Sequence, residues 1–136
     1  MKRFFIAAVM SVSALLAAAA PSKASHADGI EAYQKNDFRK ALREFKGCSD
    51  DARCMYMLGL MYEKGEGVKL DYTESAEWYR KGVEKDDQLC QYRLGRLYER
   101  GLGVEENLTE AIRMYKKSAQ KNNSNAKQAL KRLESK

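Results

Sequence analysis

The segment YEKGEGVKLDYTESAEWYRKG, residues 62–82, decides the fold, because the chain repeats it as YERGLGVEENLTEAIRMYKKS, residues 98–118. The copies start 36 residues apart and keep the same residues at equal offsets: Gly65 and Gly67 with Gly101 and Gly103, Thr73-Glu74 with Thr109-Glu110, and Tyr79 with Tyr115. A period of about 20 to 50 residues is typical of stacked repeats rather than of one globular core. The sequence therefore predicts a short array of similar units.

Each copy predicts two helices. In the first copy, apolar residues recur at helical spacing over residues 51–64. Gly65 is expected to end this helix, because glycine readily adopts the left-handed backbone of a helix C-terminus. The second helix is expected to begin at Asp71, where DYTE places a capping acceptor three residues before Glu74. NLTE at 107–110 repeats that arrangement in the second copy.

The pattern continues at both ends of the array. Residues 29–45 predict a shorter helical hairpin with a turn at Asn36-Asp37, and SNAKQALKRLESK predicts a single closing helix. No strand pattern interrupts the chain, and its only proline is Pro21. We therefore predict an all-α fold, an α/α superhelix of stacked antiparallel helix pairs. Its expected units are an opening hairpin, two repeats and a capping helix, at 28–50, 51–86, 87–122 and 123–136.

Residues 1–27 have the features of a secretory signal peptide: a basic start, the apolar run FFIAAVMSVSALLAAAA and a segment of small residues. Cleavage is expected after Ala24 or Ala27, and an uncleaved membrane anchor is the alternative. Removal of the segment takes away three basic residues and no acid, so the net charge falls from +6 to +3. A surface of mixed charge argues against nucleic-acid binding. We expect a periplasmic or secreted protein with no membrane insertion after cleavage.

The segment YMLGLMYEKGEGVKLDYTESAEWYRKG, residues 56–82, resembles the Sel1-like repeat, a helical hairpin related to the tetratricopeptide repeat. The resemblance covers residues 51–118, and residues 29–45 look like a tetratricopeptide-type opening hairpin. It implies a right-handed superhelix that serves as a protein-binding scaffold, and it names no partner. We therefore expect a non-catalytic protein that binds another protein or peptide of the cell envelope or the host.

The chain has three cysteines, and the repeat alignment separates them. Cys54 and Cys90 occupy the same position one period apart, while Cys48 corresponds to Gly82. Only Cys54 therefore has a neighbouring partner in Cys48. Cysteine-rich bacterial members of the resembled family join consecutive helices by one disulfide per repeat, although here the first linker is two residues shorter than the second. We expect a structural Cys48–Cys54 disulfide worth about 2 kcal/mol.

Two alternatives for the cysteines remain. A redox pair is disfavoured, because the chain has no C-x-x-C motif. Cys90 is expected to be a buried small apolar residue in a monomer. A Cys90-linked dimer is the alternative.

Catalytic chemistry has little support in the sequence. His26 is the only histidine, and cleavage after Ala27 would remove it, so we expect no metal site, no cofactor and no catalytic residue. The cysteine-rich relatives have been described as penicillin-binding or weak β-lactamase-like proteins, which makes that activity the alternative function. Two S-x-x-K matches exist, SAQK at 118–121 and SNAK at 124–127, but the S-D-N and K-T-G motifs of such enzymes are absent.

The expected binding surface is a stripe along the first helix of each repeat, which lines the concave side of tetratricopeptide-like stacks. Its residues are Arg53, Tyr56, Leu60 and Glu63 in the first copy, and Leu89, Tyr92, Arg96 and Glu99 in the second. Tyrosine and arginine concentrate binding energy at interfaces. The recurrence of Tyr56 as Tyr92 also fits a half-buried core residue. The difference between Leu60 and Arg96 suggests partner recognition, so Arg96→Glu is expected to abolish capture without changing the melting curve.

Overall fold

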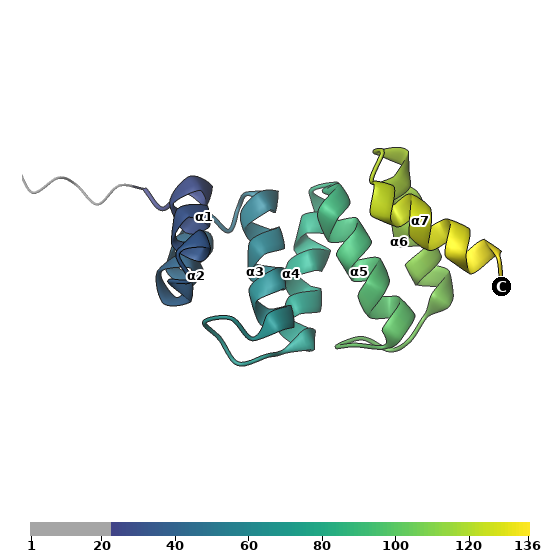
Figure 1. Ribbon diagram of the computed structural model, residues 1–136, viewed down its shortest axis with the longest axis horizontal. Helices are drawn as coiled ribbons and strands as arrows, with labels where there is room; N and C mark the ends of the chain where they lie inside the picture. Colours follow the sequence, from purple (N-terminus) through teal and green to yellow (C-terminus); the bar gives the residue numbers. More distant parts are fainter. Residues whose placement is uncertain (1–22) are drawn as a thin grey trace, which may run out of the picture.

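A computed structural model describes residues 23–136, which form seven α-helices and no strand (Figure 1). The helices are α1 (His26–Gln34), α2 (Phe38–Gly47), α3 (Ala52–Lys64), α4 (Tyr72–Glu84), α5 (Gln88–Arg100), α6 (Leu108–Gln120) and α7 (Ser124–Glu134). The predicted all-α fold is confirmed. Most of the predicted signal peptide lies outside the described residues. Within residues 23–136, no helix has both the length and the apolar character needed to span a membrane.

The helices pack as consecutive hairpins, α1–α2, α3–α4 and α5–α6, and α7 closes the end of the stack (Figure 1). Three successive apolar clusters fill the spaces along the array rather than one central core. The first includes Phe45 and Leu58, the second Tyr79 and Leu94, and the third Tyr115 and Ala126. Stability in such a stack comes from contacts between neighbouring units.

One glycine–aromatic contact recurs in each hairpin. A Cβ atom on Gly59 would overlap the ring of Tyr79, and Gly95 stands in the same relation to Tyr115. The opening hairpin repeats the contact between Gly29 and Phe45. The aromatic rings are fully buried, so each glycine lets the two helices of a hairpin approach closely enough to enclose one. This contact explains why Gly59 and Tyr79 recur together as Gly95 and Tyr115.

The loop between α3 and α4 and the loop between α5 and α6 each contain two glycines with different structural roles. Gly65 and Gly101 adopt left-handed backbone, with φ of 69° and 64°, and end α3 and α5. Gly67 and Gly103 follow, and a Cβ on either would overlap backbone atoms of the preceding hairpin, at Phe38 and Tyr72 respectively. Each loop therefore rests on the start of the preceding second helix, and both loops lie along one edge of the stack (Figure 1).

Candidate functional site

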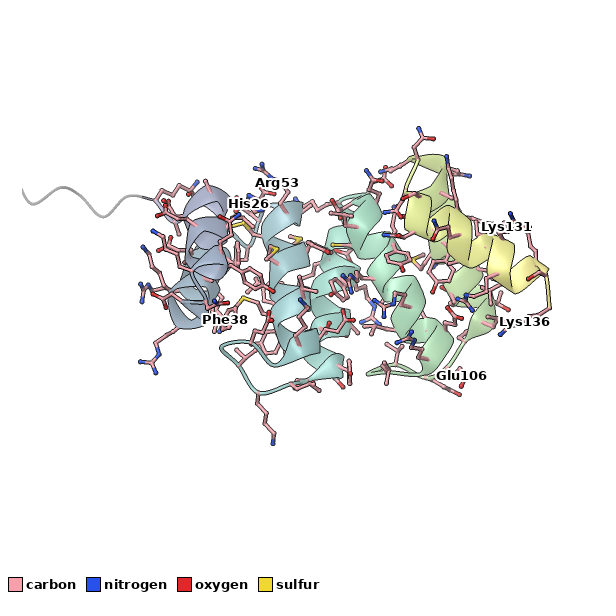
Figure 2. All side chains as sticks on the ribbon, in the orientation of Figure 1. His26, Phe38, Arg53, Glu106, Lys131 and Lys136 are labelled. Atoms are coloured by element: carbon pink, nitrogen blue, oxygen red, sulfur yellow. A yellow bond between two sulfur atoms is a disulfide. The ribbon has the colours of Figure 1, made fainter. Side chains whose placement is uncertain are left out.

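The predicted binding residues lie on α3 and α5, but they do not form one continuous exposed stripe. Leu60 has an exposed fraction of only 7% and belongs to the first apolar cluster, so its assignment to an accessible surface is wrong. Leu89 is 43% exposed at the start of α5. Arg53 is exposed near His26, at the edge of the stack where α3 begins, and it pairs with the α3 capping residue Asp51 at 2.7 Å (Figure 2).

The two tyrosines of the stripe are half-buried. The ring of Tyr56 lies 6.2 Å from that of Tyr79, and the ring of Tyr92 lies 5.8 Å from that of Tyr115, measured between centroids. Each tyrosine therefore covers the buried aromatic residue of its own hairpin. These residues serve the packing of the repeat and still show part of their surface.

The glutamates of the stripe join one repeat to the next. Glu63 Oε2 accepts a hydrogen bond of 2.6 Å from the Tyr79 hydroxyl, and its Oε1 lies 3.9 Å from a guanidinium nitrogen of Arg96. One period later, Glu99 accepts a 2.6 Å bond from Tyr115 and pairs with Arg132 at 2.7 Å. We call these two sets, Glu63–Tyr79–Arg96 and Glu99–Tyr115–Arg132, the inter-repeat triads.

The electrostatics of the second triad keep its carboxylate charged. Burial raises the pKa of Glu99, but the hydrogen bonds from Tyr115 and Arg132 and the charge of Arg132 outweigh it, so the net pKa is lowered. Burial and the neighbouring carboxylate raise the pKa of the Tyr115 phenol. The Tyr79 phenol of the first triad is shifted in the same direction. Both tyrosines therefore act as hydrogen-bond donors.

Arg96 also contributes to the contact between repeats, a role that the sequence did not indicate. Its side chain is 27% exposed and faces Glu63 of the preceding repeat. The corresponding residue in α3 is Leu60, which packs into the first apolar cluster against the α1–α2 hairpin. The difference between Leu60 and Arg96 thus follows from the neighbouring hairpin.

A polar hollow of about 670 Å³ opens between α5 and α7, on the side of the stack formed by the first helices. We call it the α5–α7 hollow. Its lining residues are Tyr92, Arg96, Glu99 and Arg100 of α5, Tyr115 of α6, and Asn125, Gln128, Ala129 and Arg132 of α7. The binding stripe predicted from the sequence contains three of these residues, Tyr92, Arg96 and Glu99. It contains none of the α7 residues, because α7 was expected only to close the stack. One signal pointed to α7: Arg132 follows Arg96 by one period of 36 residues.

The two S-x-x-K segments do not bring a serine and its lysine together. Ser118 is fully buried and its hydroxyl donates to the Gln88 carbonyl oxygen at 2.7 Å, while Lys121 pairs with Asp86 at 2.6 Å. Ser124 is the first residue of α7, and Lys127 donates to the Asn122 side chain at 3.0 Å. Within residues 23–136, no hydrogen bond joins either serine hydroxyl to its lysine.

The cysteines lie where one hairpin is followed by the next. A disulfide joins Cys48 at the end of α2 to Cys54 in α3, with 5.9 Å between their Cα atoms. Cys90 is a free, fully buried thiol, and burial raises its pKa. Its sulfur lies where a Cβ on Gly82 would be, so Gly82 and Cys90 face each other as Cys48 and Cys54 do.

The fold and the repeats agree with known proteins. The family model of the Sel1 repeat matches residues 52–87 and 88–123. Both matches are shifted by one residue from the expected repeats at 51–86 and 87–122. The crystal structure of a Sel1 repeat protein from Oxalobacter formigenes is similar, with a TM-score of 0.77, 28% identity, and coverage of 80% of this chain and 46% of that chain. The c5321 protein, a protective antigen of uropathogenic Escherichia coli with an SLR fold, has a TM-score of 0.71 and 29% identity over 74% of this chain and 23% of that one.

Cysteine-rich protein B of Helicobacter pylori shares the fold, with a TM-score of 0.64, 24% identity, and coverage of 75% of this chain and 89% of that chain. This chain spans less than half the length of the first two structures. A search of curated proteins finds no match. The two matched repeats cover more than half of the residues, and the described helices follow their period. The chain belongs to the Sel1 repeat family.

Proposed function

We propose that this protein is an exported, non-catalytic scaffold that binds another protein or peptide through its first-helix side. The observation that carries the proposal is the α5–α7 hollow, which joins tyrosine, arginine and amide side chains in one open concavity. Such residues form the centres of protein interfaces. Of the groups that would support hydrolysis, Ser118 and Lys127 are engaged in other hydrogen bonds and Lys121 in an ion pair with Asp86.

Two observations support export to the periplasm or beyond. The Cys48–Cys54 disulfide suits an oxidising compartment. The similar c5321 protein is a protective antigen. The partner proposed for this chain is accordingly a protein or peptide of the cell envelope or the host.

The binding test uses a variant that closes the hollow. Ala129 lies one period after Arg93, whose side chain fills the corresponding space between α3 and α5. The fold therefore accommodates an arginine at this position of the repeat. Ala129→Arg is expected to fill the hollow in the same way. Gln120→Arg adds the same charge at an exposed site outside the hollow and serves as the control.

Both variants and the wild-type chain are used to capture proteins from an envelope extract, and captured proteins are then purified and titrated individually. We expect at least one partner to bind the wild type and Gln120→Arg but not Ala129→Arg. A partner set that is identical for all three proteins would contradict binding at the hollow. Turnover of a chromogenic β-lactam that is lost in Ser118→Ala or Ser124→Ala would contradict the non-catalytic function.

A further inference from the structure

The α5–α7 hollow carries an excess of positive charge. Three arginines line it, Arg96, Arg100 and Arg132, and Glu99 is its only acidic side chain. Both oxygens of Glu99 are occupied, since Arg132 contacts Oε1 at 2.7 Å and the Tyr115 hydroxyl contacts Oε2 at 2.6 Å. The charge of Glu99 is thus already neutralised within its triad, and the other two arginines set the potential of the hollow.

Arg96 and Arg100 keep most of their binding capacity. Arg96 lies 3.9 Å from Glu63, and Arg93 is closer to the same oxygen at 3.5 Å. Arg100 is exposed at the end of α5 and has no ion-pair partner within the part of the chain that the structure describes. A guanidinium offers several N–H donors in a planar fork that fits a carboxylate. An anionic group in the hollow would therefore find donors that the protein does not use itself.

One substitution between the repeats creates this opening. Between α3 and α5, the guanidinium of Arg93 lies 5.9 Å from the centre of the Tyr56 ring and fills the space beside Glu63. The corresponding residue in α7 is Ala129, which leaves the Tyr92 ring and the neighbouring arginines accessible. The hollow thus exists because Ala129 lacks the long side chain that Arg93 has one period earlier.

We infer that the α5–α7 hollow binds an aspartate or glutamate side chain of an acidic peptide segment; this inference rests on the proposed function and names its class of partner. Arg96 and Arg100 bind the carboxylate, and the Tyr92 ring packs against the adjacent part of the peptide. Asn125 and Gln128 can donate to and accept from its backbone. A hollow of about 670 Å³ matches the size of sites that enclose several ligand groups rather than a single ion.

The experiment measures binding of fluorescent nine-residue peptides by anisotropy. One peptide carries two glutamates in an alanine–glycine–serine background, its partner carries glutamines at the same positions, and inorganic phosphate is a third ligand. The proteins are the wild type, Ala129→Arg, Arg100→Gln and Lys64→Gln. Lys64 is the counterpart of Arg100 one period earlier and does not line the hollow, so it is the matched control.

We expect the wild type and Lys64→Gln to bind the glutamate peptide at least about tenfold more tightly than the glutamine peptide, with affinity falling as salt rises. Arg100→Gln should lose about tenfold in affinity, and Ala129→Arg should lose binding. Arg100 is exposed, so its variant tests the inference even if Ala129→Arg fails to fold.

Equal binding of the two peptides, or an unchanged affinity in Arg100→Gln, would overturn the inference. Phosphate that displaces the peptide at micromolar concentration would also overturn it, because the site would then be selective for a free anion. If the acidic peptides do not bind, but the wild type still captures an envelope protein that Ala129→Arg does not capture, the proposed protein-binding function stands and this inference fails. If acidic peptides bind but no captured protein depends on the hollow, the proposed protein-binding function fails instead.

Discussion

Two boundaries between repeats can be compared, one between α3 and α5 and the other between α5 and α7. Both have an inter-repeat triad, and they differ at the position of Arg93, which is Ala129 in α7. In each triad, a tyrosine hydroxyl donates to a glutamate, and this glutamate faces an arginine on α5 or α7, the first helix of the following unit. At the first boundary Arg93 also occupies the space beside the triad, whereas at the second Ala129 leaves the α5–α7 hollow. The repeated residues hold the stack together, and the changed residue determines where a surface is available.

The largest expected effect tests whether the triads are equivalent scaffolds. Tyr79→Ala and Tyr115→Ala each remove a fully buried ring and leave a glutamate without its hydroxyl donor. Each variant is expected to lower the free energy of unfolding by about 3–5 kcal/mol, measured by urea denaturation. Tyr→Phe at the same positions should lose far less, since the ring remains. A small loss in only one of the two alanine variants would show that the boundaries are not equivalent.

The second prediction extends the comparison to the preceding boundary, between the hairpins α1–α2 and α3–α4, which has a disulfide that the boundary between α3–α4 and α5–α6 lacks. Gly82→Cys places a thiol against the buried sulfur of Cys90 and should form a second bridge. The closed loop is short, so the gain in unfolding free energy is about 2 kcal/mol.

A thiol titration of denatured protein should then find no free cysteine, and the melting temperature should fall on reduction. The control is Gly82→Ala, whose Cβ meets the Cys90 sulfur without the possibility of a bond, and it is expected to destabilise the fold. Two free thiols in Gly82→Cys would contradict the prediction.

The third prediction separates the arginines of the two triads. Arg96→Glu places a second carboxylate near Glu63, which is itself half-buried, and should lower the free energy of unfolding by about 1–2 kcal/mol. Arg132 is more exposed than Arg96, so Arg132→Glu should cost less. Chemical denaturation of both variants measures the difference. An unchanged melting curve for Arg96→Glu would show that the contact of Arg96 with Glu63 does not stabilise the stack.

The smallest expected effect is a pH dependence specific to the second triad. The folded-state pKa of Glu99 lies below its ordinary value of 4.5, so its contribution to stability is present above that pH and is lost as the pH falls through the folded pKa. Between about pH 5 and 3, the unfolding free energy of Glu99→Gln should therefore decline less steeply than that of the wild type. Glu134→Gln, a change at an exposed position, should keep the wild-type slope.

Much of the helical array could be predicted from the sequence, because its signals are local. Gly65 ends α3 and Asp71 caps α4 through interactions within a few residues, and the period of 36 places their counterparts at Gly101 and Asn107. The site was predicted less well. The stripe contained Tyr92, Arg96 and Glu99 of the hollow, but it also included Leu60, whose spacing on α3 cannot show that the preceding hairpin covers it.

By itself, the sequence determined the repeat, the helical hairpins and the residues that recur in them, because capping and helical periodicity act over one or two turns. Only the tertiary structure decided which of the remaining side chains face each other across a repeat boundary. Glu63 and Arg96, or Gly67 and Phe38, meet only when consecutive hairpins are stacked at a definite distance and angle. The α5–α7 hollow belongs to the same class, since it exists because two helices approach each other where one side chain is too small to fill the space between them.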